Sequence, residues 1–143
     1  MILSGADVRQ YIAHGGLQFT PPLDDDQFQQ NGVDLILAEA TLGTPSSRQF
    51  TLARTREFIT MPNDLMAFVQ LRSTWARHGL ILPPTVVDAG FQGTITLEVA
   101  SFGENVLPIG ERFAHLIFAK LTSPSEPYRG KYQGQVEITG ARP

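Results

Sequence analysis

The chain has 143 residues, no cysteine and a formal net charge of −3. The lack of cysteine excludes a disulfide framework, a thiolate nucleophile and zinc sites built on Cys. The slightly acidic balance, without a lysine- and arginine-rich run, argues against nucleic-acid binding, although a few arginines suffice for a phosphorylated small molecule. There is no signal-peptide pattern and no apolar stretch of membrane-spanning length, so we expect a soluble cytoplasmic protein without membrane contact.

The predicted elements are mostly short strands, because glycine and proline interrupt the chain often. Ser4 and Asp7 predict the start of a helix that ends at Gly15. A second helix of one or two turns is predicted over residues 72–79. Strands are predicted at residues 17–20, 32–38, 48–53, 56–60, 65–71, 94–101 and 112–121, with 80–82 and 85–87 as the arms of a tight reversal around Pro83-Pro84.

The predicted fold class is therefore mainly all-β, with a short N-terminal helix and a short internal helix. A sandwich, a jelly roll and a distorted barrel all agree with this pattern. The length predicts a single domain over residues 1–143, in which the polar, glycine-rich segment 124–143 is a mobile C-terminal arm.

Metal and nucleophile motifs are not found. The three histidines lie far apart in the sequence, and the H-x-E and P-C-x-x-C signature of zinc deaminases is absent, so no zinc is expected. No G-x-S-x-G elbow is present. A strand that leads into a helix at residues 72–77 suits phosphate oxygens, but taken alone this segment favours a simpler interpretation, in which Ser73 caps the helix and the arginines face water.

The predicted strand 94–101 raises the question of whether its one carboxylate, Glu98, is functional. Its alternation places Ile95, Leu97 and Val99 on one face and Thr94, Thr96 and Glu98 on the other. A lone carboxylate on the polar face of a strand is usually exposed to solvent.

Several segments together resemble the dCTP deaminases, within the dUTPase superfamily of trimeric β-proteins. The resemblance runs nearly end to end, and its motifs occur in the family's order. They are Met1-Ile-Leu-Ser4, Pro21-Pro-Leu-Asp24, Gln30-Asn-Gly-Val-Asp-Leu35, Leu71-Arg-Ser-Thr-Trp-Ala-Arg-His-Gly79, Asp88-Ala-Gly-Phe-Gln-Gly93 followed by I-T-L-E, Ile109-Gly-Glu-Arg-Phe-Ala-His-Leu116, and Pro127-Tyr128 with Lys131-Tyr-Gln-Gly-Gln135.

The resemblance implies a distorted β-barrel or jelly roll of the dUTPase-like type and a homotrimer with sites shared between subunits. It places Glu98 as the general base that activates water without a metal. By the same resemblance, Ser73 and Arg77 position that water and stabilise charge, while Arg72 and Thr74 contact the triphosphate. Asp88 is expected near the sugar 3′-hydroxyl, and Phe91 is expected to stack on the deoxyribose. Contacts from the closing arm to the substrate are expected from Tyr128, Lys131 and Gln135. Mg²⁺ would accompany the triphosphate, with no metal ligands from the protein.

Departures from the family pattern leave undetermined which base the substrate carries. Only ten residues separate Arg77 from Asp88, Trp75 replaces a leucine, His115 replaces a glutamine, and Val136-Glu-Ile-Thr replaces a basic, proline-containing ending. The leading hypothesis is a dCTP deaminase, with or without further hydrolysis to dUMP, because Glu98 is present. The alternatives are a dUTPase that uses Asp88 and Mg²⁺ and a non-catalytic nucleotide-binding relative.

Overall fold

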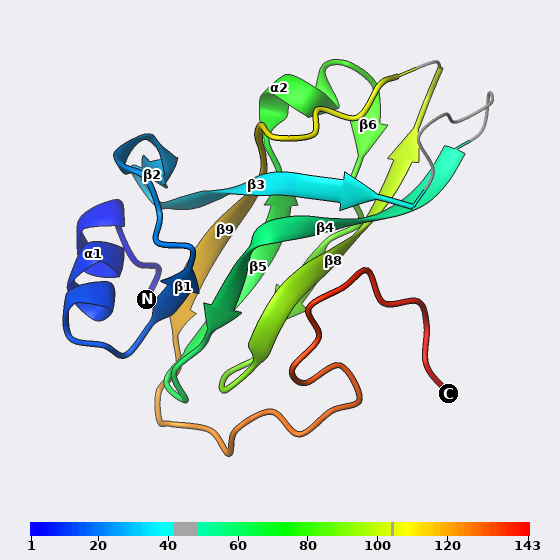
Figure 1. Cartoon of the computed structure of the whole chain (residues 1–143). Coiled ribbons are helices and arrows are strands. Elements are labelled where there is room, and N and C mark those ends of the chain that lie inside the picture. The colour runs from blue at the N-terminus through cyan, green and yellow to red at the C-terminus, as the bar shows by residue number, and fades with distance from the viewer. Residues whose placement is uncertain (42–48, 104) are drawn as a thin grey trace.

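A computed structural model describes residues 1–41, 49–103 and 105–143 of the chain (Figure 1). The helices are α1 (Gly5–Ala13) and α2 (Ser73–Ala76), and a 3₁₀ turn, η1, spans Asp25–Gln27. The strands are β1 (Gln18–Thr20), β2 (Phe28–Gln29), β3 (Gly32–Ala40), β4 (Gln49–Thr60), β5 (Leu65–Leu71), β6 (Leu80–Ile81), β7 (Thr85–Val87), β8 (Gln92–Ser101) and β9 (Arg112–Lys120). None of the helices described is long and apolar enough to cross a membrane.

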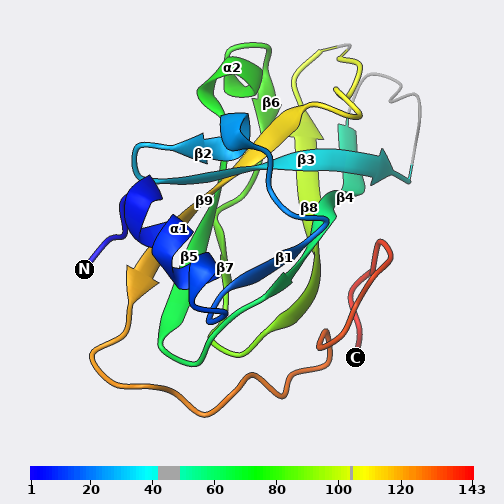
Figure 2. The same ribbon diagram turned by 60° about the vertical axis from the view of Figure 1, so that its left-hand side comes forward.

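The strands form a curled antiparallel sheet. Its order is β6-β8-β4-β3-β9-β5-β7, while β1 pairs with β4 and β2 pairs with β3. Figure 2 shows β3 crossing over the strands behind it, so that the sheet wraps around an interior filled by side chains such as Phe113, Phe118, Leu35 and Leu97. The mainly all-β prediction with two short helices is confirmed.

The predicted helix start is confirmed in detail. Ser4 Oγ accepts a hydrogen bond from the Asp7 N–H at 3.1 Å, and the Asp7 carboxylate accepts one from the Ser4 N–H at 3.0 Å. The bond from the Ser4 backbone lowers the pKa of Asp7 because it stabilises the ionised carboxylate. This reciprocal cap fixes the first turn of α1, and Val8 on its inner side is fully buried.

The prediction of separate strands at 48–53 and 56–60 is wrong. These residues belong to one strand, β4, whose pairing with β8 shifts register between Arg54 and Phe58. Thr55 keeps the ladder satisfied at the shift, since its Oγ1 accepts a hydrogen bond from the Ile95 N–H at 3.0 Å. The irregularity is therefore a bulge inside a continuous strand. Arg48 lies outside the residues described.

The predicted reversal around Pro83-Pro84 is also wrong. β6 pairs with β8, whereas β7 pairs with β5, at the opposite end of the strand order. The two prolines carry the chain between the two edges of the curled sheet. Proline suits such a connection because it cannot donate a ladder hydrogen bond.

The bulge in β4 lies beside a fully buried carboxylate, Glu57. One of its oxygens accepts a hydrogen bond from Gln27 Nε2 at 2.9 Å, and the other accepts one from the Ile36 N–H at 3.0 Å. Arg56 lies 3.1 Å from the same carboxylate. Burial raises the pKa of Glu57, and these hydrogen bonds and the Arg56 charge oppose that effect. The carboxylate ties η1, β3 and β4 together.

We expect Glu57→Ala to lower the free energy of unfolding by about 2–4 kcal/mol, because it leaves a buried N–H without an acceptor and opens a cavity. Urea denaturation would measure this loss. The matched control is Glu39→Ala, which removes a half-exposed carboxylate paired with Arg54 at 2.7 Å; its effect should stay below about 1 kcal/mol. Equal losses in the two variants would contradict the role of Glu57.

Candidate active site

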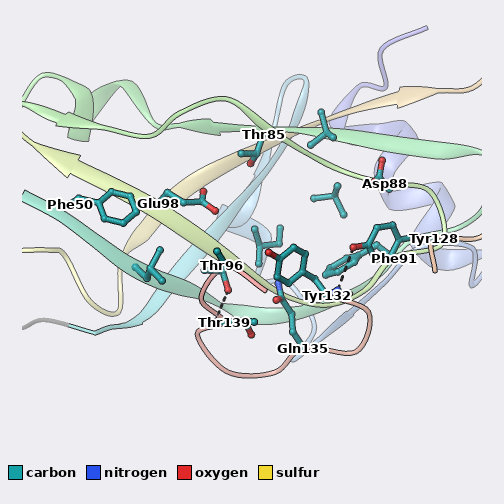
Figure 3. Close-up of a pocket in the computed structure, with 15 residues that line it drawn as sticks. Phe50, Thr85, Asp88, Phe91, Thr96, Glu98, Tyr128, Tyr132, Gln135 and Thr139 are labelled. Atoms are coloured by element: carbon teal, nitrogen blue, oxygen red, sulfur yellow. Dashed lines mark hydrogen bonds between the residues drawn. The ribbon is translucent and has the colours of Figure 1, made fainter. Parts of the chain in front are cut away.

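A cavity of about 400 Å³ lies between β4, the stretch from β7 to β8, and the C-terminal arm (Figure 3). Its walls are mainly apolar, with a few polar groups that converge on it, which is typical of a small-molecule site. The lining residues are Phe50, Leu52, Thr85, Val86, Val87, Asp88, Phe91, Ile95, Thr96, Glu98, Tyr128, Tyr132, Gln135, Thr139 and Ala141.

The carboxylates in this cavity come from β8 and from the turn that precedes it. Glu98 is half-buried and stands opposite Leu52 of β4, while Asp88 is exposed at the start of the turn. Figure 3 shows Asp88 and Glu98 at different parts of the cavity, with Thr96 near Glu98. The polar face predicted for this strand is thus the wall of a pocket.

The C-terminal arm covers the polar face of β8, and Figure 1 shows it, in red, running beside that strand. The Thr94 N–H donates to the Gln135 carbonyl at 2.8 Å, and Gln135 Nε2 donates back to the Thr94 carbonyl at 2.9 Å. Farther along, the Thr139 N–H donates to Thr96 Oγ1 at 3.1 Å. Thr94 is buried as a result, although alternation alone assigned it to solvent.

Aromatic side chains join the arm to the turn. The Phe91 and Tyr128 rings pack edge to face, with centroids 5.7 Å apart, and the Tyr128 N–H donates to the Ala89 carbonyl at 2.9 Å. Gln135 also lines the cavity, and its Oε1 is buried without a hydrogen-bond partner among the residues that the structure describes. A buried acceptor of this kind is costly unless a ligand supplies a donor.

The site residues predicted on α2 lie away from this cavity. Ser73, Thr74 and Arg77 are exposed, and none of them lines the cavity that holds Glu98. Ser73 does not cap the helix with its side chain, because Arg72 occupies the N-cap position without a side-chain cap bond. Trp75 fixes this turn to β9 by donating from Nε1 to the Arg112 carbonyl at 2.7 Å.

Arg72 instead contacts a buried acid. Its Nε lies 2.9 Å from Asp34 Oδ2, close enough for an ion pair although the alignment is not that of a hydrogen bond. His115 Nδ1 lies 2.8 Å from the other oxygen of Asp34. Asp34, Arg72, Ser73 and His115 line a separate, shallow polar pocket. One chain therefore holds the predicted site residues in two separate places.

Sequence reasoning missed several lining residues. Thr96 shares the face of Glu98 and could have been found from the alternation. Tyr132 lies within the K-Y-Q-G-Q motif. Phe50, Thr85 and Thr139 had no signal, because only the folded arm and sheet bring them together. Among residues 1–41, 49–103 and 105–143, no three acidic or histidine side chains are grouped closely enough to hold a metal ion.

Comparison with known proteins gives this arrangement a family. A family model described as dCTP deaminase-like matches residues 43–121. A dCTP deaminase of Sulfurisphaera tokodaii is 41% identical over 97% of this chain and 91% of its own length. The chain belongs to the dCTP deaminase-like family. The recognition of the family from its ordered motifs is confirmed.

Further relatives of this dCTP deaminase-like chain are named as a deaminase or as a nucleotidohydrolase. A dCTP deaminase of Hyperthermus butylicus is 40% identical, covering all of this chain and 99% of its own length. A probable deoxyuridine 5′-triphosphate nucleotidohydrolase of Sulfolobus islandicus rod-shaped virus 1 is 41% identical, covering 99% of each chain. The alignments extend over 177 and 157 positions, more than the residues of this chain, so it lacks segments that these relatives have.

Solved structures agree on the fold of the family member. The 2′-deoxycytidine 5′-triphosphate deaminase of Agrobacterium tumefaciens superposes with a TM-score of 0.66 at 19% identity, over 84% of this chain and 47% of that one. The EIAV dUTPase gives a TM-score of 0.56 at 21% identity, over 82% of this chain and 98% of that one. The predicted dUTPase-like barrel is confirmed.

The contact between arm and β8 depends on a glycine. A Cβ added to Gly93 would lie 2.8 Å from the Gln135 carbonyl oxygen and 2.8 Å from Phe91 Cζ. We expect Gly93→Ala to push the arm away from β8 and to speed hydrogen exchange at the Thr94 amide about tenfold, equivalent to about 1.4 kcal/mol. Exchange mass spectrometry would measure the change.

Gly140→Ala is the control for this substitution, because nothing lies within 4 Å of the added methyl group. The exchange rate at Thr94 should not change in that variant. An unchanged rate in Gly93→Ala would show that the arm does not depend on this close approach.

Proposed function

We propose that this chain is a cytoplasmic dCTP deaminase, which converts dCTP and water to dUTP and ammonia. The observation that carries the proposal is the place of Glu98. Its carboxylate lines the cavity, half-buried, and in the described part of the chain it forms no hydrogen bond or ion pair. It is therefore available to bind and deprotonate a water molecule.

In this reaction Glu98 takes a proton from water, and the resulting hydroxide adds to C4 of cytosine. Glu98 passes this proton to ring N3, then takes the proton of the new C4 hydroxyl and delivers it to the amino group, so that the C4–N bond breaks, ammonia leaves and the C4 carbonyl of uracil remains. The apolar side chains around the carboxylate, Leu52 and Phe50, reduce hydration and so favour proton transfer by it. The water supplies the new oxygen of the product.

The other cavity residues bind the rest of the nucleotide. Phe91 provides an apolar surface for the deoxyribose, and Asp88 is an acceptor for the sugar 3′-hydroxyl. Tyr128 and Gln135 close the cavity from the arm, and the unpartnered Gln135 Oε1 is an acceptor for a ligand donor. Mg²⁺ would be held by the phosphate oxygens of the substrate, since the described residues offer no metal cage; when bound, it neutralises phosphate charge.

A second candidate is hydrolysis of dUTP to dUMP and pyrophosphate. Asp88 favours it, because this exposed carboxylate at the cavity can orient a water molecule toward the α-phosphate. The viral relative named as a nucleotidohydrolase matches this chain over 99% of each sequence, and the short interval between Arg77 and Asp88 alters the region that the family uses to read the base. Both activities in one enzyme would yield dUMP from dCTP.

Product analysis separates the two candidates. Purified protein is incubated with Mg²⁺ and either dCTP or dUTP, and the products are resolved by chromatography. We expect dUTP and ammonia from dCTP, with a rate about 10²- to 10⁴-fold lower in Glu98→Gln. Pyrophosphate from dUTP with dCTP unchanged, lost in Asp88→Asn, would establish the second candidate instead. Inertness toward both would leave a nucleotide-binding protein without catalysis.

We also propose a homotrimer in which α2 of a neighbouring copy completes the cavity. Ser73 and Arg77 carry exposed polar groups that their own chain does not bring to Glu98. Apolar side chains are also exposed beside the cavity, where Phe68 of β5 pairs in register with the lining residue Val86 of β7 and their exposures are 38% and 50%. Such a surface favours contact with another copy.

Mixing of inactive variants tests the shared site. We expect Glu98→Gln and Ser73→Ala each to lose activity alone. If α2 acts across the interface, subunit exchange between the two variants forms some sites with both wild-type residues and restores part of the activity. Light scattering on the mixture would report its mass. No recovery from a mixture that has exchanged subunits would place Ser73 and Glu98 of one chain in the same site.

A further inference from the structure

Beyond the proposed function, on which this inference rests, the Glu98 end of the cavity contains an aromatic side chain that the sequence motifs do not include. Phe50, near the start of β4, lines the cavity although the residue is 63% exposed. It is not part of the hydrophobic core of the described residues, and no other aromatic ring among them pairs with it. Phe50 therefore presents to the cavity an aromatic surface that has no partner in the described chain.

The register between β4 and β8 places this ring beside Glu98. Leu52 stands opposite Glu98, and Phe50 stands opposite Ala100, two residues farther along β8. Because alternate residues of a strand share a face, Phe50 and Glu98 lie on the same side of the sheet as diagonal neighbours. Such neighbours are about 7–8 Å apart, a distance that an aromatic side chain can span. The short side chain of Ala100 leaves room for the ring to do so.

The two ends of the cavity differ in the residues that they hold. Figure 3 shows Phe50 and Glu98 at one end, and Asp88, Phe91 and Tyr128 at the other. The residues proposed to bind the deoxyribose, Asp88 and Phe91, thus stand at the end away from Phe50. Since the base is joined to the sugar, a nucleotide whose sugar lies at Phe91 extends its base toward Phe50 and Glu98.

A pyrimidine ring matches a site made of one aromatic face and one carboxylate. The faces of the pyrimidine stack on aromatic rings, whereas its polar atoms, including N3 and the substituent on C4, lie at its edge. A base stacked on Phe50 keeps this edge free for hydrogen bonds with Glu98. Hydroxide adds to C4 perpendicular to the ring, so a base covered by Phe50 on one face is attacked from the other.

We propose that Phe50 stacks on the pyrimidine base of the substrate, whose edge then faces Glu98. Stacking does not depend on the substituents at the ring edge, so Phe50 contributes to the binding of dCTP and dUTP alike. The choice between these two bases depends instead on Glu98 and the other polar groups that meet the edge of the ring.

A ligand that lacks the base tests this role. Binding of the α,β-imido analogues of dCTP and of 2-deoxyribose 5-triphosphate is measured by calorimetry with Mg²⁺, in Glu98→Gln protein so that the nucleotide persists. We expect Phe50→Leu, which keeps an apolar side chain but not the ring, to weaken binding of the dCTP analogue about 5- to 100-fold. Binding of the base-free triphosphate should not change. Phe50→Tyr, which keeps a ring, should bind both ligands as the parent protein does.

Phe102→Leu is the matched control, because it makes the same substitution at an exposed phenylalanine that does not line the cavity. Its affinities should equal those of the parent protein. Equal weakening of both ligands in Phe50→Leu would indicate a structural or subunit contact, which light scattering would tell apart, and would overturn the proposal. So would an unchanged affinity for the dCTP analogue, the same loss in Phe50→Tyr or Phe102→Leu, or no nucleotide binding by the parent.

The two proposals fail in different ways. If the wild-type protein binds dCTP without converting it, the proposed chemistry is wrong, and the comparison with the base-free ligand still tests Phe50. If it deaminates dCTP and Phe50→Leu binds both ligands normally, the chemistry stands and Phe50 has no role in binding.

Discussion

The cavity exists because the arm is hydrogen-bonded to β8. The reciprocal hydrogen bonds between Thr94 and Gln135 place the arm over a strand face that would otherwise meet solvent, and they bring Tyr128, Tyr132 and Gln135 opposite Glu98. Gly93 allows this approach, since any larger residue would collide with the Gln135 carbonyl. A carboxylate on an ordinary strand thus becomes part of an enclosed site through hydrogen bonds that involve both the main chain and the side chain of Gln135.

The barrel keeps β8 in register through its neighbour, β4. The bulge near Thr55 and the buried carboxylate of Glu57 connect β4 to η1 and β3, so the strand that supports Glu98 is fixed on its far side by a satisfied polar network. Asp34 is a second buried acid, next to α2, and its carboxylate contacts Arg72 and His115. Buried acids thus support both groups of predicted site residues, those around Glu98 and those of α2, although the two groups lie apart within one chain.

Much of the fold could be predicted from local signals. The Ser4–Asp7 cap, the alternation of β8 and the apolar run of β9 depend on neighbouring residues and were identified correctly. The bulge in β4 and the separate partners of β6 and β7 depend on contacts distant in sequence, which no local pattern specifies. For the site, the motifs named Glu98, Asp88, Phe91, Tyr128 and Gln135, which the structure brings to one cavity, whereas no motif indicated Phe50 or Thr139.

The Pro83-Pro84 connection has a consequence for solubility. It ends the curled sheet with the very short edge strands β6 and β7, of which neither offers a long row of free N–H and carbonyl groups. Open-ended addition of strands from other molecules is thereby suppressed, even though apolar side chains such as Phe68 and Val86 remain on the surface. Two such short edges offer few backbone hydrogen bonds to another molecule, so contacts between copies would depend on side chains instead.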